Sequence, residues 1–445
     1  MQNFAIAIIK FFAEDISMVR NELSQKFMDG ANSWCDIAPG TAEGRRIRVV
    51  IFGATGSVGT GALNVIRRWM DCVELVGISA RTNVEKLAQI AREFSVKNVG
   101  IFDEMAFDGQ ASLFADGTKF FVGEGGLCEL GQLPNVDAVL MAIDGIAGLK
   151  ATIAAIKAGK TILLASKEIL VVAGKFVSEC AKKNGVNLLP VDSEHNAIFQ
   201  CLFGNDRKFV DRLILTASGG PFREFSAKAM ESITVEQALV HPTWRMGKKI
   251  TVDSATMANK GLEIVEARWL FDVPVERIDV LVHPESVIHS MVQFCDGSVI
   301  SQACPPNMEF PIANCLFFPE RKRSLIPTVD FAALGSLTFS QPDCGKFPSL
   351  SIARQCLGAG GNACAVFHGA NEVAVEKFLA GSIKFTEIPA IIAGTLDAYS
   401  GEMDESLEGA IASVGNARSI AETISSKTKA APLSHCGRTE FHAGA

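Results

Sequence analysis

The sequence predicts an α/β protein in three parts: an N-terminal doubly wound parallel sheet, a central α+β region and a small C-terminal helical region. From residue 46 to about residue 191, short β-branched runs alternate with amphipathic helical patterns, which is typical of a parallel sheet covered by helices. From residue 278 to residue 303 strand-like runs follow one another, and the last two flank Asp296-Gly297, a strong hairpin signal. After Pro342 only helical patterns remain.

Composition narrows the class of protein. The chain has 445 residues, of which 48% are hydrophobic, so it can build two or three domains with their own cores. A net charge of −7 without a sustained basic stretch argues against nucleic acid and membrane as partners. The 12 cysteines form no C-x-x-C pair, which argues against a zinc knuckle or a thioredoxin-type motif and favours a reduced cytosol.

The first 45 residues are predicted to be a weakly ordered extension. The apolar run over residues 4–9 is interrupted by Lys10, Glu14 and Asp15, so it is too short for a membrane span. It lacks the cationic front of a signal peptide, and its acids argue against an organellar transit peptide.

The first strand of the parallel sheet, predicted over residues 46–52, ends in a glycine-rich loop, Gly53-Ala-Thr-Gly56-Ser-Val-Gly59, before a helix that ends at Arg68. Glycines at this spacing let the backbone turn tightly and approach a pyrophosphate at the positive end of the helix. The loop therefore predicts a dinucleotide site, with a plain tight turn as the alternative.

The second strand, predicted over residues 73–79, indicates which dinucleotide binds. It ends in Ala80-Arg81-Thr82-Asn83, where an NAD-binding unit would place an acid for the ribose hydroxyl. An arginine there favours NADPH, because a guanidinium can bind the 2′-phosphate. The remaining strands of this sheet are predicted over residues 96–102, 136–143, 161–165 and 186–191.

Two carboxylates follow the last of these strands. Ligands of such folds bind at the carboxyl ends of the strands, where Asp192 and Glu194 are placed. In extended backbone, side chains two residues apart point the same way, so the two acids can converge on a divalent, oxygen-seeking cation. The alternative is a solvated turn before a helix over residues 196–202.

Lys167 is an unusual residue at the start of the helix predicted over residues 169–183. A lysine in a first helical turn opposes the helix dipole, but it suits a site for an anionic substrate. The alternative is that Ser166 and Glu168 simply form an ordinary helix start.

The central region adds three further candidates. A strand from Leu213 runs into the turn at Ser218-Gly-Gly, a possible anion nest. Residues 241–249 combine glycine and proline with Trp244 and Met246, which suits a mobile lid, although a surface loop tucking Trp244 into the core is the commoner use. In the segment 252–263, Asn259, Lys260 and Glu263 share one helical face, either as surface decoration or as a phosphate site beside a third metal ligand.

The last strands and helices complete the prediction. Strands are expected over residues 278–282, 287–294 and 298–303, and pairing of such sheets could form a dimer. Helices are expected over residues 350–357, 363–379, 387–399 and 407–425, followed by a polar tail over residues 428–445.

These motifs together resemble one family, the 1-deoxy-D-xylulose 5-phosphate reductoisomerases, in the same order over residues 46–427. The resemblance implies a homodimeric, NADPH-dependent enzyme that isomerises and reduces 1-deoxy-D-xylulose 5-phosphate to 2-C-methyl-D-erythritol 4-phosphate in the non-mevalonate isoprenoid pathway. It implies Mg²⁺, Mn²⁺ or Co²⁺ as the metal, and a cytoplasmic rather than a plastid location. The matching motifs are Gly53–Gly59, Ser166–Glu168, Asp192–Gln200, Thr216–Phe222, His241–Gly247 and Asp253–Glu263.

The resemblance also implies the site residues and the domain division. Lys167, Glu194 and His241 are implied to be catalytic, with the metal on Asp192, Glu194 and Glu263. The substrate would contact Lys167, Ser193, Glu194, Ser218, His241, Ser254, Asn259, Lys260 and Glu263. The cofactor would contact Thr55, Gly56, Ser57, Val58, Arg81, Thr82, Asn83, Ser166, Glu168 and Gly247. The domains would be an extension (1–45), an NADPH domain (46–191), a catalytic domain (192–341) with a lid (241–248), a helical domain (342–427) and a tail (428–445).

The chain departs from the family's pattern in three places, one of which is the first 45 residues, for which the family has no counterpart. Two other functions remain as alternatives. Ser166 stands where the family usually has asparagine, and residues 367–372 (Phe-His-Gly-Ala-Asn-Glu) replace an Asn-Ala-Ala-Asn-Glu pattern. A different NADPH oxidoreductase of the short-chain type would need a lysine four residues after a tyrosine, but Tyr399 is followed there by Met403. A non-catalytic NADP(H)-sensing module would have no reason to bring three acids and two lysines to strand and helix ends.

Overall fold

The computed structural model describes residues 45–324, 326–401 and 406–428. The predicted extension (1–45) and tail (428–445) therefore lie outside the described residues, except for Arg45 and Thr428. None of the described helices is long and apolar enough to cross a membrane.

The first sheet has seven parallel strands in the order β4-β3-β2-β1-β5-β6-β7. Four successive residues of the central strand β1, from Val49 to Phe52, are buried, as expected for a parallel sheet covered on both faces. Strand order reverses between β1 and β5, which is where ligands bind in such sheets. The strands are β1 (Ile47–Phe52), β2 (Val73–Ala80), β3 (Asn98–Ile101), β4 (Lys119–Val122), β5 (Ala138–Met141), β6 (Thr161–Leu164) and β7 (Leu188–Pro190).

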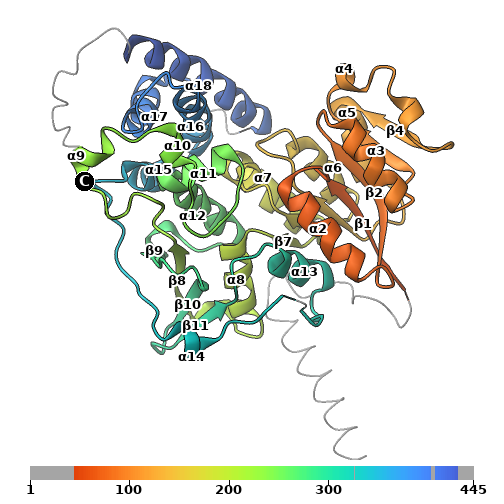
Figure 1. The fold of residues 1–445 in the computed structure, drawn as a ribbon, viewed down its shortest axis with the longest axis horizontal. Coiled ribbons are helices and arrows are strands. Elements are labelled where there is room, and N and C mark those ends of the chain that lie inside the picture. The colour runs from red at the N-terminus through yellow and green to blue at the C-terminus, as the bar shows by residue number, and fades with distance from the viewer. Residues whose placement is uncertain (1–44, 325, 402–405, 429–445) are drawn as a thin grey trace, which may run out of the picture.

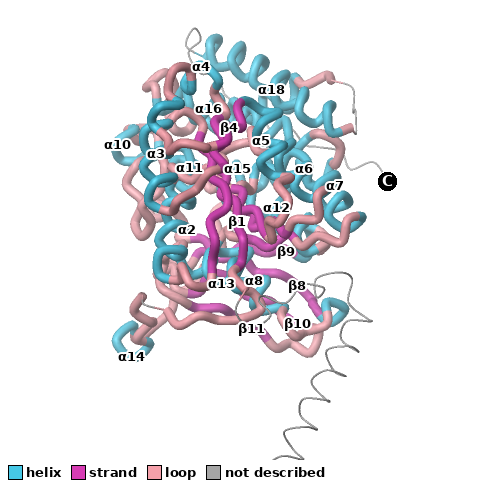
Figure 2. The backbone as a smooth tube through the Cα atoms, turned by 90° about the vertical axis from the view of Figure 1, so that its right-hand side faces the viewer, coloured by secondary structure: helices cyan, strands magenta, loops and turns pink. Residues whose placement is uncertain are grey.

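Helices cover this sheet on its two sides. Figure 2 shows α2 and α3 on one side and α6 and α7 on the other. The helices of this part are α2 (Ser57–Arg68), α3 (Val84–Glu93), α4 (Glu104–Phe107), α5 (Gly123–Gly131), α6 (Leu149–Lys157) and α7 (Glu168–Lys183), with a 3₁₀ turn, η1 (Ala111–Leu113). Strand β4 was not predicted, because four residues between a loop and a helix give no recognisable period.

The second sheet is mixed and has the order β11-β10-β8-β9. The hairpin predicted at Asp296-Gly297 is confirmed, because β10 and β11 pair antiparallel on either side of it. Strand β11 lies at the sheet edge, with Val299 and Ile300 exposed. The strands are β8 (Val210–Ala217), β9 (Ile278–Val282), β10 (Ile288–Phe294) and β11 (Val299–Ala303).

The helices around the second sheet carry the polar motifs, and α8 packs against β10 and β11 (Figure 1). Helix α13 was not predicted; it packs back onto α2 of the first sheet. These elements are α8 (Ser193–Leu202), η2 (Arg207–Phe209), α9 (Ala227–Met230), α10 (Val235–Ala238), α11 (Lys248–Ala255), α12 (Ala258–Phe271), η3 (Val275–Arg277), α13 (Glu309–Phe317) and α14 (Phe331–Leu334).

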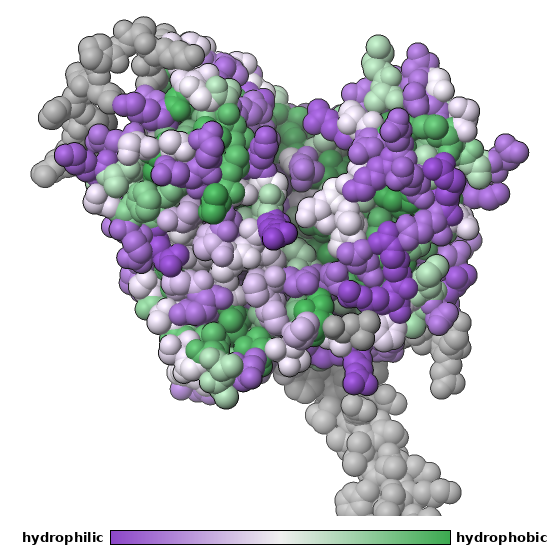
Figure 3. Space-filling view, viewed as in Figure 1, coloured by the Kyte–Doolittle hydropathy of each residue, from purple (hydrophilic) through white to green (hydrophobic). Residues whose placement is uncertain are grey.

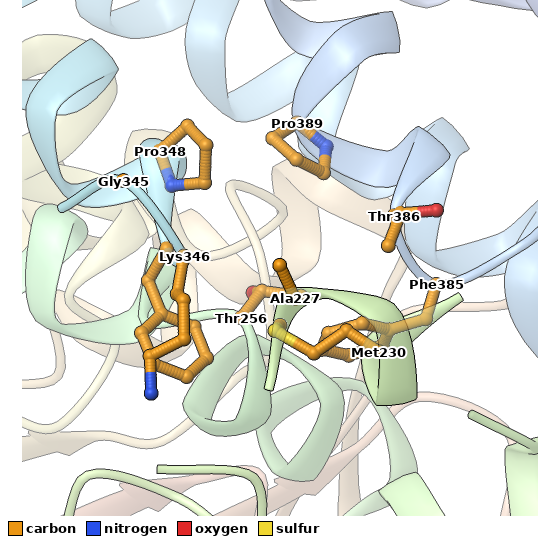
Figure 4. Close-up of a pocket in the computed structure, with 10 residues that line it drawn as sticks. Ala227, Met230, Thr256, Gly345, Lys346, Pro348, Phe385, Thr386 and Pro389 are labelled. Carbon is orange, nitrogen blue, oxygen red and sulfur yellow. The ribbon is translucent and has the colours of Figure 1, made fainter. Parts of the chain in front are cut away.

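The C-terminal part is helical, as predicted, and α16 packs against the other three helices of this part. They are α15 (Pro348–Ala359), α16 (Ala363–Leu379), α17 (Glu387–Ala398) and α18 (Leu407–Thr428). Figure 3 shows a notch between this helical part and the first sheet. A cavity of about 220 Å³, lined mainly by apolar side chains such as Met230 and Phe385, lies between α9 and the first turns of α15 and α17 (Figure 4).

Candidate active site

The structure brings Asp192, Glu194 and Glu263 together. One carboxylate oxygen of each lies within 4.8 Å of the others. The sequence analysis expected Asp192 and Glu194 to converge because they lie two residues apart in extended backbone. That expectation was wrong, because α8 begins at Ser193 rather than at residue 196. Asp192 is the N-cap of α8, Glu194 lies in its first turn, and Glu263 comes from α12. Two helices, rather than one extended strand, therefore set the spacing of the acids.

Two buried lysines bind these carboxylates. The Lys167 Nζ lies 3.0 Å from Glu263 Oε1 and 3.0 Å from Asn259 Oδ1, and it forms an ion pair with Asp192. The Lys260 Nζ lies 3.0 Å from Glu194 Oε1 and also pairs with Glu263. Lys167 is the N-cap of α7, so the unfavourable position opposite the helix dipole is explained by its contacts with acids from other elements.

The cluster has an excess of negative charge. Three carboxylates face two ammonium groups, which leaves one negative charge uncompensated. Burial and the charge of Glu263 raise the pKa of Glu194 to about 7. Burial alone would raise the pKa of Asp192, but Lys167, together with His195 and Lys260, outweighs burial and lowers that pKa. Glu194 can therefore hold a proton near neutral pH.

The donor set fits a hard divalent cation. All three candidate ligands are carboxylates, which suit Mg²⁺ and Mn²⁺. A divalent cation would also balance the excess negative charge and remove the repulsion that raises the pKa of Glu194.

A buried pair behind the cluster was missed by the sequence reasoning. His195 and Glu266 are fully buried, with Nδ1 and Oε2 3.3 Å apart. The His195 Nε2 donates to the backbone oxygen of Glu263 at 2.8 Å, which ties α8 to α12. Burial and the charge of Asp192 raise the pKa of Glu266 well above its usual value. The signal for it was the Glu263 to Glu266 spacing of three residues, which places both acids on one helical face.

A second group forms on the other side of the site. The Nε2 of His241 lies 3.1 Å from the hydroxyl oxygens of Ser218 and Ser254. Its Nδ1 accepts from the backbone N–H of Trp244 at 2.9 Å, so Nε2 carries the proton and the ring is neutral. Burial lowers the pKa of His241 to about 4, in agreement with a neutral ring.

The turn after Ser218 lies directly against α11. Gly219 and Gly220 both have positive φ, and a Cβ on Gly220 would lie 3.1 Å from the Cα of Ala255. Asn259 and Lys260, in contrast, point their polar atoms at the carboxylate cluster in this structure: the amide nitrogen of Asn259 donates to Glu263, and Lys260 pairs with Glu194 and Glu263. Ser218, Ser254 and His241 thus form one group. Asn259 and Lys260, which were predicted to lie beside them, belong to the carboxylate cluster in this structure.

The predicted lid, residues 241–248, contains no helix or strand before α11 begins at Lys248. Trp244 is half-buried and its ring contacts the His289 ring at a centroid distance of 6.1 Å. Arg245 and Gly247 are exposed. The loop is therefore attached to the site through His241 and Trp244, while four of its other residues are exposed, namely Pro242, Arg245, Gly247 and Lys248.

The glycine loop lies between β1 and α2, as predicted. Gly53 has φ +81, and a Cβ there would lie 2.1 Å from the backbone oxygen of Ala142 on the neighbouring strand end, so no other residue fits. Gly56 is the N-cap of α2 and has no side-chain cap. The Lys86 Nζ, which the sequence reasoning missed, donates to the backbone oxygen of Thr55 at 2.8 Å and holds the loop. Its position three residues after the N-cap of α3, Asn83, was the available signal.

The remaining cofactor candidates differ in exposure. Arg81, Thr82 and Asn83 are exposed at the end of β2, and Asn83 also caps α3 by accepting from the N–H of Lys86 at 3.1 Å. Ser166 is buried and donates its hydroxyl to the backbone oxygen of Ile143 at 2.5 Å. The helix predicted from residue 169 begins at Glu168. Of the other candidates, Ser57 and Val58 follow the glycine loop at the start of α2, and Gly247 lies near the C-terminal end of the lid.

Comparisons with known proteins agree over nearly all of the described chain. Three family models match: 1-deoxy-D-xylulose 5-phosphate reductoisomerase over residues 49–174, and its C-terminal domains over residues 188–271 and 304–420. The chain is 46% identical over 382 residues to 1-deoxy-D-xylulose 5-phosphate reductoisomerase of Ralstonia nicotianae, covering 84% of this chain and 97% of that protein.

Solved structures give the same answer. The reductoisomerase from Zymomonas mobilis in complex with NADPH matches with a TM-score of 0.81 and 41% identity, covering 86% of this chain and 99% of that one. A structure of DOX-P reductoisomerase in complex with NADPH, fosmidomycin and magnesium matches with a TM-score of 0.81 and 40% identity, with the same coverage.

Proposed function

Because the chain belongs to the 1-deoxy-D-xylulose 5-phosphate reductoisomerase family, we propose that its carboxylate cluster, serine group and glycine loop divide that family's reaction among them. The protein is an NADPH-dependent oxidoreductase that converts 1-deoxy-D-xylulose 5-phosphate to 2-C-methyl-D-erythritol 4-phosphate in isoprenoid biosynthesis. Its cofactors are NADPH and magnesium, and its substrate is a small phosphorylated molecule.

The metal would be held by Asp192, Glu194 and Glu263. The observation that supports this assignment is the approach of one oxygen from each acid to within 4.8 Å of the others. Magnesium, manganese or cobalt bound there would supply Lewis-acid stabilisation of negative charge on the substrate's carbonyl and hydroxyl oxygens.

The lysines and Ser193 would orient the sugar. The Ser193 hydroxyl donates to Glu194 Oε2 at 2.6 Å and so fixes that carboxylate beside the substrate. The ammonium of Lys167 can donate to substrate oxygens while it keeps its contact with Glu263. In this proposal the carbon skeleton rearranges first, by cleavage and re-formation of a carbon–carbon bond, and the hydride of NADPH then reduces the resulting aldehyde.

The phosphate would lie on the other side of the sugar. Ser218 and Ser254 offer hydroxyl groups there, and His241 would close over it with the lid, residues 241–248. Asn259 and Lys260 would join them by turning away from the carboxylates once these are otherwise neutralised. The contacts of Lys260 with Glu194 and Glu263 would then be a feature of the ligand-free protein.

The cofactor would lie across the carboxyl ends of β1 and β2. Thr55, Gly56, Ser57 and Val58 would receive the pyrophosphate at the start of α2. Arg81, Thr82 and Asn83 are exposed and would contact the 2′-phosphate end. The nicotinamide end would reach Ser166, Glu168 and Gly247, with Ser166 acting through a bridging water because its hydroxyl is already bonded to Ile143.

The assembly and the wider setting belong to the same proposal. A homodimer is supported by β11, an edge strand with Val299 and Ile300 exposed, which can pair with a second copy. We place the enzyme in the cytoplasm, with an NADPH domain over residues 46–191, a catalytic domain over 192–341 and a helical domain over 342–427. Neither nucleic acid nor membrane is a partner in this proposal.

The decisive experiment is NADPH oxidation by the purified full chain with 1-deoxy-D-xylulose 5-phosphate, with and without Mg²⁺. Consumption of NADPH that requires both substrate and metal, with 2-C-methyl-D-erythritol 4-phosphate as the product, is expected. NADPH oxidation that is unaffected by a metal chelator would remove the metal assignment.

A further inference from the structure

A buried bridge of side chains joins the helical domain to α11, the short helix that follows the lid. The Nδ2 of Asn371, on α16, donates to Oδ1 of Asp253 at 2.7 Å. The Nζ of Lys249 donates to the other oxygen of Asp253 at 2.8 Å. Asn371 is fully buried and Asp253 is 2% exposed. A carboxylate this deeply buried depends on such partners.

Helix α11 needs a contact of this kind. It has only eight residues, which is too short for a stable helix in isolation. Lys249 precedes Asp253 by four residues, the less favourable order for such a pair, so local propensity does not account for the helix. At its C-terminal end, Thr256 lines the cavity of about 220 Å³ shown in Figure 4, so part of the space around that end is empty, although the turn at Gly220 lies against Ala255.

The orientation of α11 matters to the substrate site because Asp253 and Ser254 are consecutive. Side chains of consecutive helical residues point about 100° apart around the axis, so any rotation of the helix moves both. Asp253 faces Asn371, while the Ser254 hydroxyl lies 3.1 Å from Nε2 of His241. The contact on the helical domain therefore contributes to where Ser254 points.

The helical domain offers a rigid support for this contact. Next to Asn371, Glu372 accepts from Nη1 of Arg418 on α18 at 2.8 Å, which ties α16 to its neighbour. The Oδ1 of Asn371 has no hydrogen-bond partner in the described part of the chain. The reverse orientation of the amide would place Oδ1 against the carboxylate of Asp253, so only donation from Nδ2 is favourable.

We propose that Asn371 is a positioning residue for the substrate phosphate: through Asp253 it holds α11, and with it Ser254 and the C-terminal end of the lid, in the binding orientation. The inference rests on the proposed contact of Ser254 with the phosphate. It gives the helical domain, which supplies none of the proposed ligand-binding residues, a direct effect on substrate affinity.

The test compares two buried asparagines in the full-length enzyme, Asn371 within α16 and Asn362 at the N-cap of the same helix. Asn371→Leu removes the contact with α11, whereas Asn362→Leu removes a hydrogen bond of 2.9 Å to Ser413 within the helical domain. We expect Asn371→Leu to raise the KM for 1-deoxy-D-xylulose 5-phosphate about tenfold and to leave the KM for NADPH within about twofold. Asn362→Leu should lower the melting temperature without changing either KM. Equal KM values for 1-deoxy-D-xylulose 5-phosphate in the two variants would overturn the proposal.

If Asn371→Leu does not fold, the test can use a charge exchange between Asn371 and Asp253. Asn371→Asp alone places two carboxylates face to face and should raise the substrate KM at least as much as Asn371→Leu. Adding Asp253→Asn restores an amide–carboxylate bond in the reverse direction and should recover most of the lost affinity. Absence of any recovery in the double variant would count against the proposal.

Ser254→Ala separates this inference from the function on which it rests. If Ser254→Ala leaves the substrate KM unchanged, the phosphate assignment of Ser254 is wrong and the positioning proposal is overturned with it. If Ser254→Ala raises the substrate KM but Asn371→Leu does not, only the positioning proposal is overturned.

Discussion

The carboxylate cluster and the glycine loop are prepared for their ligands in opposite ways. In the cluster, Lys167 and Lys260 already neutralise most of the charge of the three acids, and both lysines are buried. At the loop, Gly56 and Arg81 are exposed, and the Arg81 guanidinium has no ion pair within the described ranges of the chain. A metal ion must therefore enter a site whose charges already have internal partners, whereas at the loop the cofactor meets an exposed backbone turn and a guanidinium without an ion pair.

This difference determines which changes alter ligand affinity at each site. A buried set of like charges depends on the number of charges and on pH, as the raised pKa of Glu194 indicates. A loop that offers backbone N–H groups depends on glycine geometry and on one exposed cation. Changes at one site should therefore leave the other largely unaffected, and the predictions below test this independence.

The largest effect is expected from Glu263→Gln. The change keeps the shape of the side chain but removes one of the three charges that would hold the metal, so we expect turnover at low Mg²⁺ to fall roughly a thousandfold, equivalent to several kcal/mol of transition-state stabilisation. The measurement is steady-state NADPH oxidation over a Mg²⁺ titration. NADPH binding, followed by fluorescence, should be unchanged. Normal turnover at low Mg²⁺ would show that the three acids do not share a metal.

The complementary change at the other site is Arg81→Ala. It removes the exposed guanidinium beside the glycine loop, so NADPH should bind more weakly by about 1.5–3 kcal/mol if a charged hydrogen bond to the 2′-phosphate is lost. NADH lacks that phosphate and serves as the matched ligand. Metal affinity should not change. Equal weakening of NADPH and NADH would mean that Arg81 does not select the cofactor.

The pH dependence of metal binding should distinguish the two sites further. The ordinary pKa of a glutamate is 4.5, and that of Glu194 is raised to about 7, so in the metal-free protein its proton is bound below pH 7 and lost above it. A metal ion must displace this proton, so Mn²⁺ affinity should rise by up to about tenfold per pH unit below pH 7 and then level off. Calorimetric titration from about pH 5.5 to about pH 8 would measure it. An affinity that is flat over this range would mean that no carboxyl in the cluster is protonated.

The sequence predicted the two sheets well because their strands are continuous apolar runs or alternate clearly, and the order of the motifs then placed the polar residues at strand ends. It missed β4 and α13, whose short segments have no clear period. It assigned the convergence of Asp192 and Glu194 to a strand, because side chains two apart align in extended backbone, whereas α8 starts at Ser193. Adjacent polar residues fit either geometry, and only tertiary packing decides between them.

Contacts between distant elements were beyond sequence reasoning. The Lys260 ammonium reaches Glu194, 66 residues away, and the Asn371 amide reaches Asp253, 118 residues away. Nothing in local spacing signals such pairs, because they depend on how α12 packs against α8 and how α16 packs against α11. Glu266 could have been found from its spacing to Glu263, but its burial against His195 could not.

The smallest effect of ligand binding is expected at the lid, residues 241–248, which belongs neither to the carboxylate cluster nor to the glycine loop. The lid is held to its neighbours by neutral hydrogen bonds, such as those of His241 Nε2 with Ser218 and Ser254, rather than by the paired charges of the cluster. Backbone hydrogen exchange over the lid should therefore slow by about threefold to tenfold when substrate and NADPH are both saturating, while exchange in α17, which holds no proposed ligand-binding residue, stays the same.

Unlike metal binding, protection of the lid by ligands should not depend on pH between about pH 6 and about pH 8. Burial lowers the pKa of His241 from 6.5 to about 4, so the ring stays neutral above about pH 5. Ligand-induced protection of the lid, after correction for the intrinsic exchange rate, should then be the same at about pH 6 and about pH 8, with metal kept saturating. Protection that fell at the lower pH would mean that His241 becomes charged in the open lid. Protection that was absent at both pH values would mean that residues 241–248 do not close over the ligands.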